Sequence, residues 1–355
     1  MEERKHTFRL RRLRALQLLT YVAARSVIAV VCMFSPSFVE RIGRFLGRLM
    51  YLVDGKHRKI AHKNLTRSDG WPKDARQQGR FIRRVYEHFG TCLVENLMLP
   101  KLVHGRRLLE RTRLERFDIL DRQLADGRGC ICVIAHLGNW EWAGLAVSLS
   151  GYPLNSVARP VENPWIDRYL NRFRALTGQR IIPKYGAVRA MNDVLRRGGM
   201  LVILADQDAR HGGIFIPFFG RPASTIKSPA LLALRHRKPI VPVNIWRDRE
   251  GVHHARFSEP IAPDPGLPHA EAVRSLTERM NARFEEFVRE HPTQWMWLHA
   301  RWKTAGRVLR EAAERGSAEE GDEEPEDDGV PLNDARPGTA DDGRRGAVND
   351  LKRAT

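Results

Sequence analysis

His136 and Glu141 are the most suggestive pair of chemically active side chains in this sequence. They stand five residues apart in the string HLGNWE (136–141), directly after the apolar run 131–135. A neutral imidazole can take a proton from a hydroxyl group near neutral pH, so His136 is a candidate general base. If a helix begins in this turn, Glu141 can fold back on the imidazole, fix its tautomer and stabilise its protonated form. A purely structural histidine is the alternative interpretation, because this spacing is common by chance.

A second polar cluster, Asp206-Gln207-Asp208, directly follows the apolar run 200–205. In open α/β sheets, ligands bind outside the carboxyl ends of the strands. We therefore expect the two clusters to face one crevice. Asp206 and Gln207 would then bind polar groups of a substrate or orient the base. The alternative is a turn at a strand end in which Asp206 caps a backbone amide.

Alternating strands and helices are needed to position these clusters, and the sequence predicts them. Segment 74–97 places Phe81, Val85, Phe89, Leu93 and Leu97 on one helical face. Further helices are predicted at 186–197, at 227–236 and from Val273 to a stop before Pro292. Strands are predicted at 131–135, 154–158, 200–205 and 239–246. This alternation predicts the α/β class, with a mainly parallel, mixed sheet flanked by helices.

The charge is unevenly distributed along the 355 residues. The net charge is +18, but residues 311–355 carry −8, which leaves +26 on the rest of the chain. Such a positive field favours a polyanionic partner: nucleic acid, an anionic membrane surface or an acidic protein. The acidic tail has few large apolar residues, so residues 309–355 are predicted to be disordered.

The N-terminal region is basic and apolar. Residues 9–14 are basic, 15–34 are mostly apolar with Arg25 near the middle, and 38–53 are apolar but interrupted by Arg41, Arg44 and Arg48. A convincing cleavage site for a signal peptide is lacking. Three interpretations stay open: one marginal membrane span, a pair of interfacial amphipathic helices, or two ordinary core helices. We expect residues 1–65 to associate with a membrane and residues 66–308 to form the catalytic domain.

The four cysteines do not indicate a metal centre. Cys130 and Cys132 are expected on one face of a strand, and no Cys/His cluster has zinc spacing. We expect neither a metal nor another cofactor.

Several strings together resemble a known family. HLGNWE resembles the HxxxxD/E signature of glycerolipid-type acyltransferases, and the whole resembles the lipid A biosynthesis branch with its related mannoside acyltransferases. The matching strings, in family order over about residues 10–305, are AHLGNWE (135–141), Arg159-Pro160, Asn163-Pro164, ADQ (205–207), IPFFGRPA (216–223), Val241-Pro242, QWMW (294–297) and RWK (301–303). An FPEGT-like string is missing, which argues against a glycerol-3-phosphate or lysophosphatidate acceptor.

The resemblance implies a membrane-associated O-acyltransferase at the cytoplasmic face of the inner membrane. It would move an acyl chain from a thioester of acyl carrier protein or coenzyme A to a hydroxyl group of a glycolipid resembling a lipid A precursor. A phosphatidylinositol mannoside or another glycolipid is the alternative acceptor. His136 would be the base and Glu141 its orienting acid.

The remaining candidate site residues each have two interpretations. Arg159 would stabilise the oxyanion or grip a phosphate, or is a surface arginine before a turn. Asn139 would donate to the oxyanion or cap a helix. The apolar string Phe218-Phe219-Gly220 would line an acyl channel or form a loop at the edge of the core.

Two other classes of function compete. The pI of 10.4 alone suggests a nucleic-acid-binding protein, but the chain lacks a zinc finger, an RNP-type motif and a KH loop. We therefore expect no nucleic-acid partner. A metal hydrolase would use His136, Glu141, Asp206 and Asp208. Acyl carrier protein is acidic, so the basic body favours the acyltransferase interpretation.

Overall fold

The computed structural model of the chain describes residues 2–105 and 107–319, with side chains described from 13 to 311 apart from residue 106. Most of the tail predicted to be disordered lies outside the described residues. The last described helix, α12 (Lys303–Glu319), extends past the predicted boundary at residue 308. The predicted boundary at residue 65 falls inside α3 (Gly55–Arg67).

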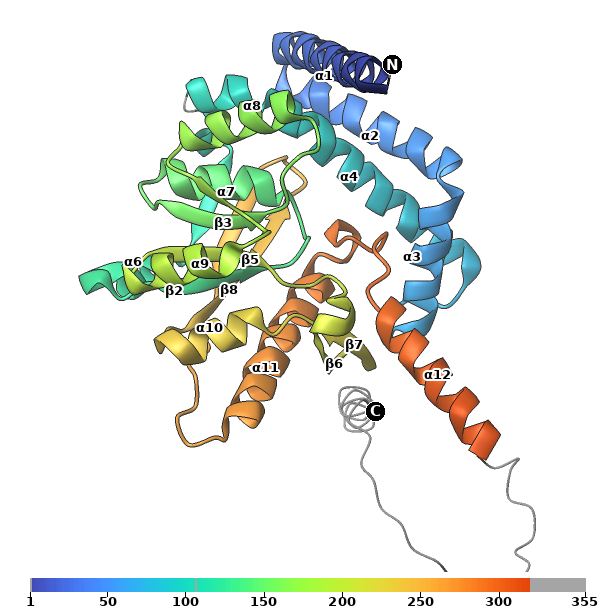
Figure 1. The fold of residues 1–355 in the computed structure, drawn as a ribbon, viewed down its shortest axis with the longest axis vertical. Helices are drawn as coiled ribbons and strands as arrows, with labels where there is room; N and C mark the ends of the chain where they lie inside the picture. Colours follow the sequence, from blue (N-terminus) through green and yellow to red (C-terminus); the bar gives the residue numbers. More distant parts are fainter. Residues whose placement is uncertain (1, 106, 320–355) are drawn as a thin grey trace, which may run out of the picture.

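A seven-stranded sheet forms the centre of the molecule (Figure 1). Its order is β1 (Thr112–Glu115), β9 (His253–Phe257), β8 (Ile240–Arg247), β2 (Cys130–Ile134), β5 (Met200–Leu204), β3 (Leu154–Ala158) and β4 (Arg180–Pro183). All neighbours are parallel except β8 and β9. The predicted α/β class with a mainly parallel, mixed sheet is confirmed. The four predicted strands correspond to β2, β3, β5 and β8.

Two helical layers cover the sheet because its strands alternate their apolar side chains. On β2, Ile131 and Val133 face one core, and Cys130, Cys132 and Ile134 face the other. The first core is covered by α9 (Ala187–Arg196), α10 (Ser228–His236) and α11 (His269–Glu290), and the second by α6 (Asp118–Leu124) and α7 (Trp140–Leu149). The Cys130 and Cys132 Sγ atoms are 3.9 Å apart, which confirms their placement on one face.

The smaller elements connect these layers. They are α5 (Arg107–Glu110), α8 (Pro164–Ala175), the antiparallel hairpin of β6 (Ile214–Phe218) and β7 (Arg221–Thr225), and 3-10 turns at Ala125–Gly127, Arg210–Gly212 and Pro292–Gln294.

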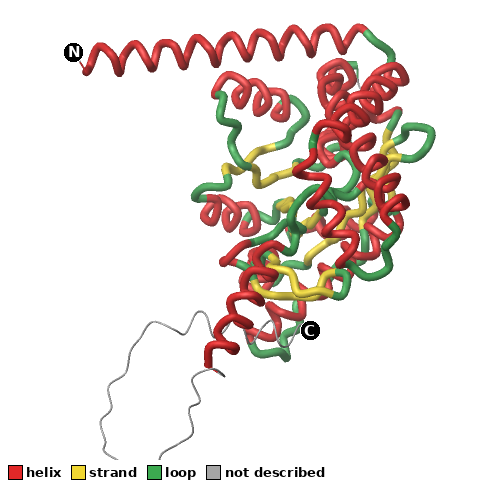
Figure 2. Tube along the Cα trace, turned by 90° about the vertical axis from the view of Figure 1, so that its right-hand side faces the viewer, coloured by secondary structure: helices red, strands yellow, loops and turns green. Residues whose placement is uncertain are grey.

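The N-terminal helices pack mainly against one another. They are α1 (Glu2–Met33), α2 (Pro36–Val53), α3 and α4 (Ala75–His104). Figure 2 shows α1 as a long helix running along one end of the molecule, largely clear of the body. Its segment Leu13–Met33 is long and apolar enough to cross a bilayer by length and composition.

Glycines allow α2 and α4 to approach each other at backbone distance. Gly43 and Gly47 on α2 face Gly90 on α4. A Cβ atom at Gly90 would stand 2.4 Å from the Gly43 carbonyl oxygen and 2.7 Å from the Gly47 Cα. These are backbone atoms that cannot rotate away, so only glycine permits this crossing.

We predict that Gly90→Ala destabilises the protein by roughly 1–3 kcal/mol, because it forces two packed helices apart. Gly79→Ala on the same helix is the matched control. Its Cβ would make an ordinary 3.5 Å contact with the Tyr51 hydroxyl, so its helix propensity gain should leave stability unchanged or higher by up to ~1 kcal/mol. Unfolding midpoints of both variants measure the difference. Equal changes in the unfolding midpoints of the two variants would contradict the claim that the α2–α4 crossing requires glycine at position 90.

Candidate active site

The pairing of β2 with β5 brings His136 and Asp206 together. The two strands are parallel, with Ile134 opposite Leu204 and the Ala205 amide bonded to the Ile134 carbonyl at 3.0 Å. His136 and Asp206 are each two residues beyond this pair. They therefore lie side by side at the carboxyl edge of the sheet, as the two-cluster argument predicted.

Asp206 holds His136 through two hydrogen bonds. Its Oδ1 is 2.6 Å from the imidazole Nδ1, and its Oδ2 accepts from the His136 amide at 2.8 Å. Trp295 Nε1 donates to Oδ2 at 2.7 Å. Burial raises the pKa of the Asp206 carboxyl, but the His136 imidazole and these hydrogen bonds outweigh it and lower the pKa to about 2. The carboxylate is therefore charged at neutral pH.

The imidazole is oriented with its other nitrogen toward Gln207. A carboxylate can only accept a hydrogen bond, so Nδ1 is protonated and donates to Asp206. Nε2 is then unprotonated and presents its lone pair. The Gln207 amide nitrogen lies 3.2 Å from Nε2, which makes it a donor to that lone pair. The Trp140 ring stands edge-on to the imidazole, with the centroids 5.0 Å apart.

The prediction that Glu141 contacts His136 is wrong for this structure. Glu141 instead accepts from Arg174 Nε at 2.6 Å and from Arg174 Nη2 at 3.0 Å. The physical reason is that α7 begins at Trp140, so Glu141 lies in its first turn. There it meets α8, and the partner of the imidazole comes from β5.

The turn between β2 and α7 requires a glycine and a cap. Gly138 has a φ of +63°, and a Cβ there would stand 2.4 Å from the Ile245 carbonyl oxygen. Asn139 is buried and caps α7, with its Oδ1 accepting from the Trp142 amide at 3.1 Å. Its Nδ2 donates to the buried carboxylate of Glu95 at 3.3 Å. Of the two interpretations of Asn139, the structure has the helix cap.

The predicted substrate arginine, Arg159, follows β3 at the same edge of the sheet. It is exposed, and within the described part of the chain it has no recorded hydrogen bond or ion pair. Because β3 lies next to β5, Arg159 is one strand further from His136 than Asp206 is. Its guanidinium is available to a ligand.

Phe218 and Phe219 are fully buried in an aromatic cluster. Their rings pack on Trp295 and Trp297 at centroid distances of 4.8 to 6.4 Å, or on each other. Gly220, with a φ of +71°, completes the turn between β6 and β7. Of the two interpretations, the structure shows the core packing, because the hairpin lies between α11 and the C-terminal segment. A role in an acyl channel stays a prediction.

Arg301 fixes the loop that follows Asp206. Its side chain is fully buried and donates to the Ser224 carbonyl at 2.5 Å, to Thr225 Oγ1 at 2.6 Å and, more weakly, to the Gln207 carbonyl at 3.4 Å. Burial lowers the pKa of Arg301 to about 10, which still leaves it charged at neutral pH. This arginine thus connects the Gln207 backbone to β7.

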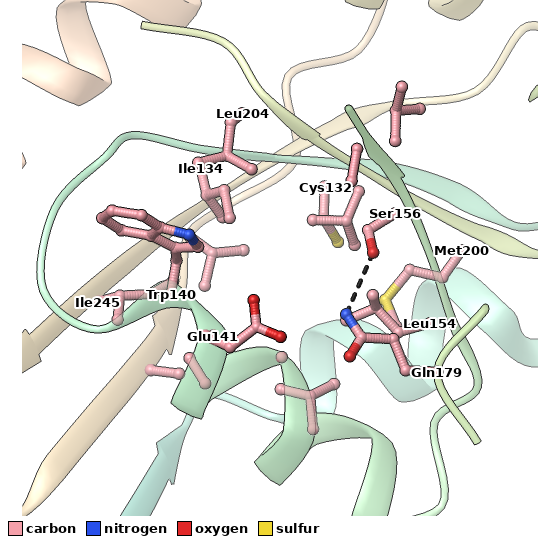
Figure 3. Close-up of a pocket in the computed structure, with 18 of the residues that line it drawn as sticks. Cys132, Ile134, Trp140, Glu141, Leu154, Ser156, Gln179, Met200, Leu204 and Ile245 are labelled. Carbon is pink, nitrogen blue, oxygen red and sulfur yellow. Dashed lines mark hydrogen bonds between the residues drawn. The ribbon is translucent and has the colours of Figure 1, made fainter. Parts of the chain in front are cut away.

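An apolar cavity of about 170 Å³ lies between the sheet and α7 (Figure 3). Most of its lining is aliphatic, including Ile134, Leu154, Val202 and Leu204. Figure 3 shows Glu141 on the side of Trp140, and the hydrogen-bonded Ser156 and Gln179 on the other side. Trp140 lines the cavity, and its ring also contacts the His136 imidazole, so this one side chain connects the two.

The four side chains of the metal-hydrolase alternative are not gathered. Glu141 binds Arg174, and Asp208 Oδ2 accepts from Thr304 at 2.7 Å. Among residues 13–311 for which side chains are described, no group of three or more His, Cys, Asp or Glu residues is arranged to hold a metal ion.

The sequence did not predict two of the contacts at this site. Trp295 binds Asp206, and Arg174 binds Glu141, yet each is distant from its partner in sequence. The QWMW string gave a signal for Trp295, but nothing distinguished Arg174 from the other arginines of its helix.

The family model described as bacterial lipid A biosynthesis acyltransferase matches residues 7–304. The chain is 25% identical over 273 residues to the phosphatidylinositol mannoside acyltransferase of Mycobacterium tuberculosis H37Rv, covering 75% of this chain and 84% of the relative. It is 26% identical over 281 residues to the lipid A biosynthesis lauroyltransferase of Escherichia coli K12, covering 78% and 89%.

We predict that the stabilising effect of Asp206 depends on pH. A carboxyl whose pKa is lower in the folded state stabilises it above the unfolded pKa of about 4, and this effect disappears as pH falls through about 2. Asp206→Asn should therefore cost roughly 2 kcal/mol at neutral pH, with the difference from the parent shrinking below pH 4. Urea unfolding at pH 7, 5 and 3 measures it.

The control is Asp193→Asn, which removes a carboxylate from the i,i+3 pair with Arg196, half exposed on α9. It should change stability by less than ~1 kcal/mol at each pH. A pH-independent cost for Asp206→Asn would contradict the assigned ionisation.

Proposed function

Because the chain belongs to the bacterial lipid A biosynthesis acyltransferase family, we propose that it transfers a fatty acyl chain from a thioester to a hydroxyl group of a glycolipid. The observation that carries this proposal is the His136–Asp206 pair, which Trp140 connects to an apolar cavity. The pair supplies a base for the hydroxyl, and the cavity supplies space for a hydrocarbon chain.

His136 Nε2 is the proposed proton acceptor. The acceptor hydroxyl approaches this nitrogen and displaces the Gln207 amide that now donates to it. As the oxygen attacks the thioester carbon, its proton moves to Nε2, and Asp206 stabilises the imidazolium that forms. The collapse of the tetrahedral intermediate expels the thiolate, which takes the proton from Nε2. We therefore assign the orienting role to Asp206 in place of Glu141.

Oxyanion stabilisation falls to donors near the imidazole. The displaced Gln207 amide stays within reach of the reacting centre, since its nitrogen starts 3.2 Å from Nε2. Arg159 lies one strand beyond Asp206 and is exposed, so it is better placed to grip a phosphate of the donor or acceptor.

The acyl chain is proposed to enter the cavity past Trp140. The wall there is aliphatic, and Glu141 and Arg174 neutralise each other at the cavity. An internally paired ion pair leaves no net charge to repel a hydrocarbon. Glu141 would then shape the cavity without taking part in proton transfer.

The donor is proposed to be an acyl carrier protein or coenzyme A. Both are polyanions, and the chain outside residues 311–355 carries a net charge of +26. Comparing transfer from the two thioesters of one fatty acid, at low and high salt, decides between them. Steep salt-dependent DNA binding without acyl transfer would instead favour a nucleic-acid-binding protein.

The acceptor is proposed to be a glycolipid of the lipid A precursor type, at the cytoplasmic face of the inner membrane. A phosphatidylinositol mannoside is the second candidate, because three of the similar proteins carry that name. Deleting the gene and measuring the glycolipids of the host by mass spectrometry tests the proposal. A glycolipid lacking the mass of one acyl group supports it and identifies the acceptor, whereas an unchanged extract contradicts it.

We predict that His136→Ala lowers acyl transfer by ~10²–10⁴-fold, because the general base is lost. Asp206→Asn should add little further loss in the His136→Ala background, since the two residues act as one unit. Glu141→Gln provides the contrast: its effect should multiply with that of His136→Ala. Initial rates of the single and double variants measure this. Non-additivity at Glu141 and additivity at Asp206 would reverse our assignment of the two carboxylates.

We also predict that the cavity sets the accepted chain length. Val202 lines it from β5, so Val202→Phe should fill part of the space and shift preference toward shorter chains. Rates with a series of acyl thioesters measure the shift, and activity with the shortest chain serves as the control for folding. A uniform loss at every length, with an unchanged unfolding midpoint, would remove the chain from this cavity.

A further inference from the structure

We propose that α1 lies in the plane of an anionic membrane surface and does not cross the bilayer. The inference takes the membrane as partner from the proposed function and adds the orientation of the protein on it. The sequence left this question open, because Leu13–Met33 passes the length and composition test for a span. The contacts of α1 with α8 decide it.

One side of α1 is attached to α8. Asn163, the N-cap of α8, donates from Nδ2 to the Gln17 carbonyl at 2.8 Å. The Tyr21 ring packs on Trp165 and Tyr169 at centroid distances of 6.2 and 6.4 Å. The Arg25 guanidinium lies 4.4 Å from the centre of the Tyr169 ring.

These contacts fall within the candidate span. At a rise of 1.5 Å per residue, Gln17 and Arg25 lie about 6 and 18 Å from Leu13 along a segment that would cross about 30 Å of hydrocarbon. If α1 spanned the bilayer, α8 would lie at the same depth. The neighbouring strands β3 and β4, to which α8 is joined, would follow it.

The composition of α8 forbids that depth. The helix carries Asp167, Arg168, Arg172 and Arg174, and Arg168 and Arg172 are exposed to solvent. Charged side chains facing hydrocarbon are strongly disfavoured, as is irregular backbone exposed to lipid. A position of α1 along the surface avoids both costs, because α8 then stays on the aqueous side.

The opposite side of α1 is apolar and unpartnered within the described residues. Leu19, Val22, Val30 and Met33 lie on it, each more than half exposed. On α2, Phe45, Leu49 and Leu52 form a second exposed apolar face. Apolar faces of this kind insert into the headgroup and acyl boundary of a bilayer.

Arginines flank the apolar face of α2, and they favour an anionic lipid surface as the occupant. Arg41, Arg44 and Arg48 lie beside this face and are exposed, and Arg44 and Arg48 also pair with Glu40 and Glu87. Exposed cations beside an apolar face attract anionic headgroups, which a second protein chain of ordinary composition would not supply. The two helices together, called here the lipid face, are therefore assigned to the membrane.

Thiol labelling tests the orientation. In a Cys32→Ala background of the full chain, Arg14→Cys places a single accessible thiol near one end of the candidate span, and Ser37→Cys places one just beyond the other end. The protein is added to preformed vesicles of phosphatidylcholine and phosphatidylglycerol and treated with a membrane-impermeant maleimide. Both thiols should be labelled from outside to within about 2-fold of their labelling in detergent.

Protection of either thiol until detergent is added would show that α1 spans the bilayer, and it would overturn the inference while leaving membrane association intact. Failure of the parent protein to bind the vesicles would overturn both the inference and the membrane association proposed above. Acyl transfer measured in detergent is independent of either result, so the chemistry of the site is judged separately.

Lipid contact is tested by charge substitution. Val22→Glu on the lipid face should weaken vesicle binding by roughly 10-fold, because it places a carboxylate among anionic headgroups and loses buried apolar surface. Val188→Glu on α9 is the matched control, since Val188 is also an exposed helical valine but lies outside the lipid face. It should leave binding within about 2-fold. Equal weakening by the two variants would reject the lipid face.

Discussion

The buried carboxylate of Asp206 is the interaction on which the site depends. A buried charge is tolerated only when its hydrogen bonds are complete, and here the donors come from separate parts of the chain. His136 arrives from β2 and Trp295 from the C-terminal segment, while Asp206 itself follows β5. The short antiparallel bridge between Leu137 and Trp295 fixes the last donor. Sheet register, the turn at Gly138 and the C-terminal segment must therefore all be in place before the imidazole is oriented.

Sequence reasoning succeeded where apolar periodicity and strand ends carry the information. It located the strands beside the site, and it placed His136 and Asp206 at one edge because parallel strands end there together. It missed β1, β4 and β9, which have four or five residues each and contain charged or polar side chains such as Arg113 and Arg180. At that length a strand is recognised by its neighbours in the sheet, and these are distant in sequence.

The wrong prediction for Glu141 has a similar origin: Asp206, and not Glu141, binds the His136 imidazole. Spacing along the chain states how far Glu141 is from His136, but the direction of its side chain depends on where α7 begins and on what packs against its first turn. Arg174 decides this, and it lies 33 residues away in α8. The same limit explains Phe218 and Phe219: an apolar string indicates burial, but it does not indicate which of several buried regions receives it.

The amide of Gln207 has a consequence for the resting enzyme. A base strong enough to activate a sugar hydroxyl would also activate water, and a thioester bound beside it would then be lost by futile hydrolysis. Because Nε2 already accepts a hydrogen bond from Gln207, a water molecule must compete with the Gln207 amide for that lone pair. A larger acceptor can offset the displacement through its own contacts elsewhere on the protein. In the mechanism proposed above, this one hydrogen bond would protect the acyl thioester until the acceptor alcohol arrives.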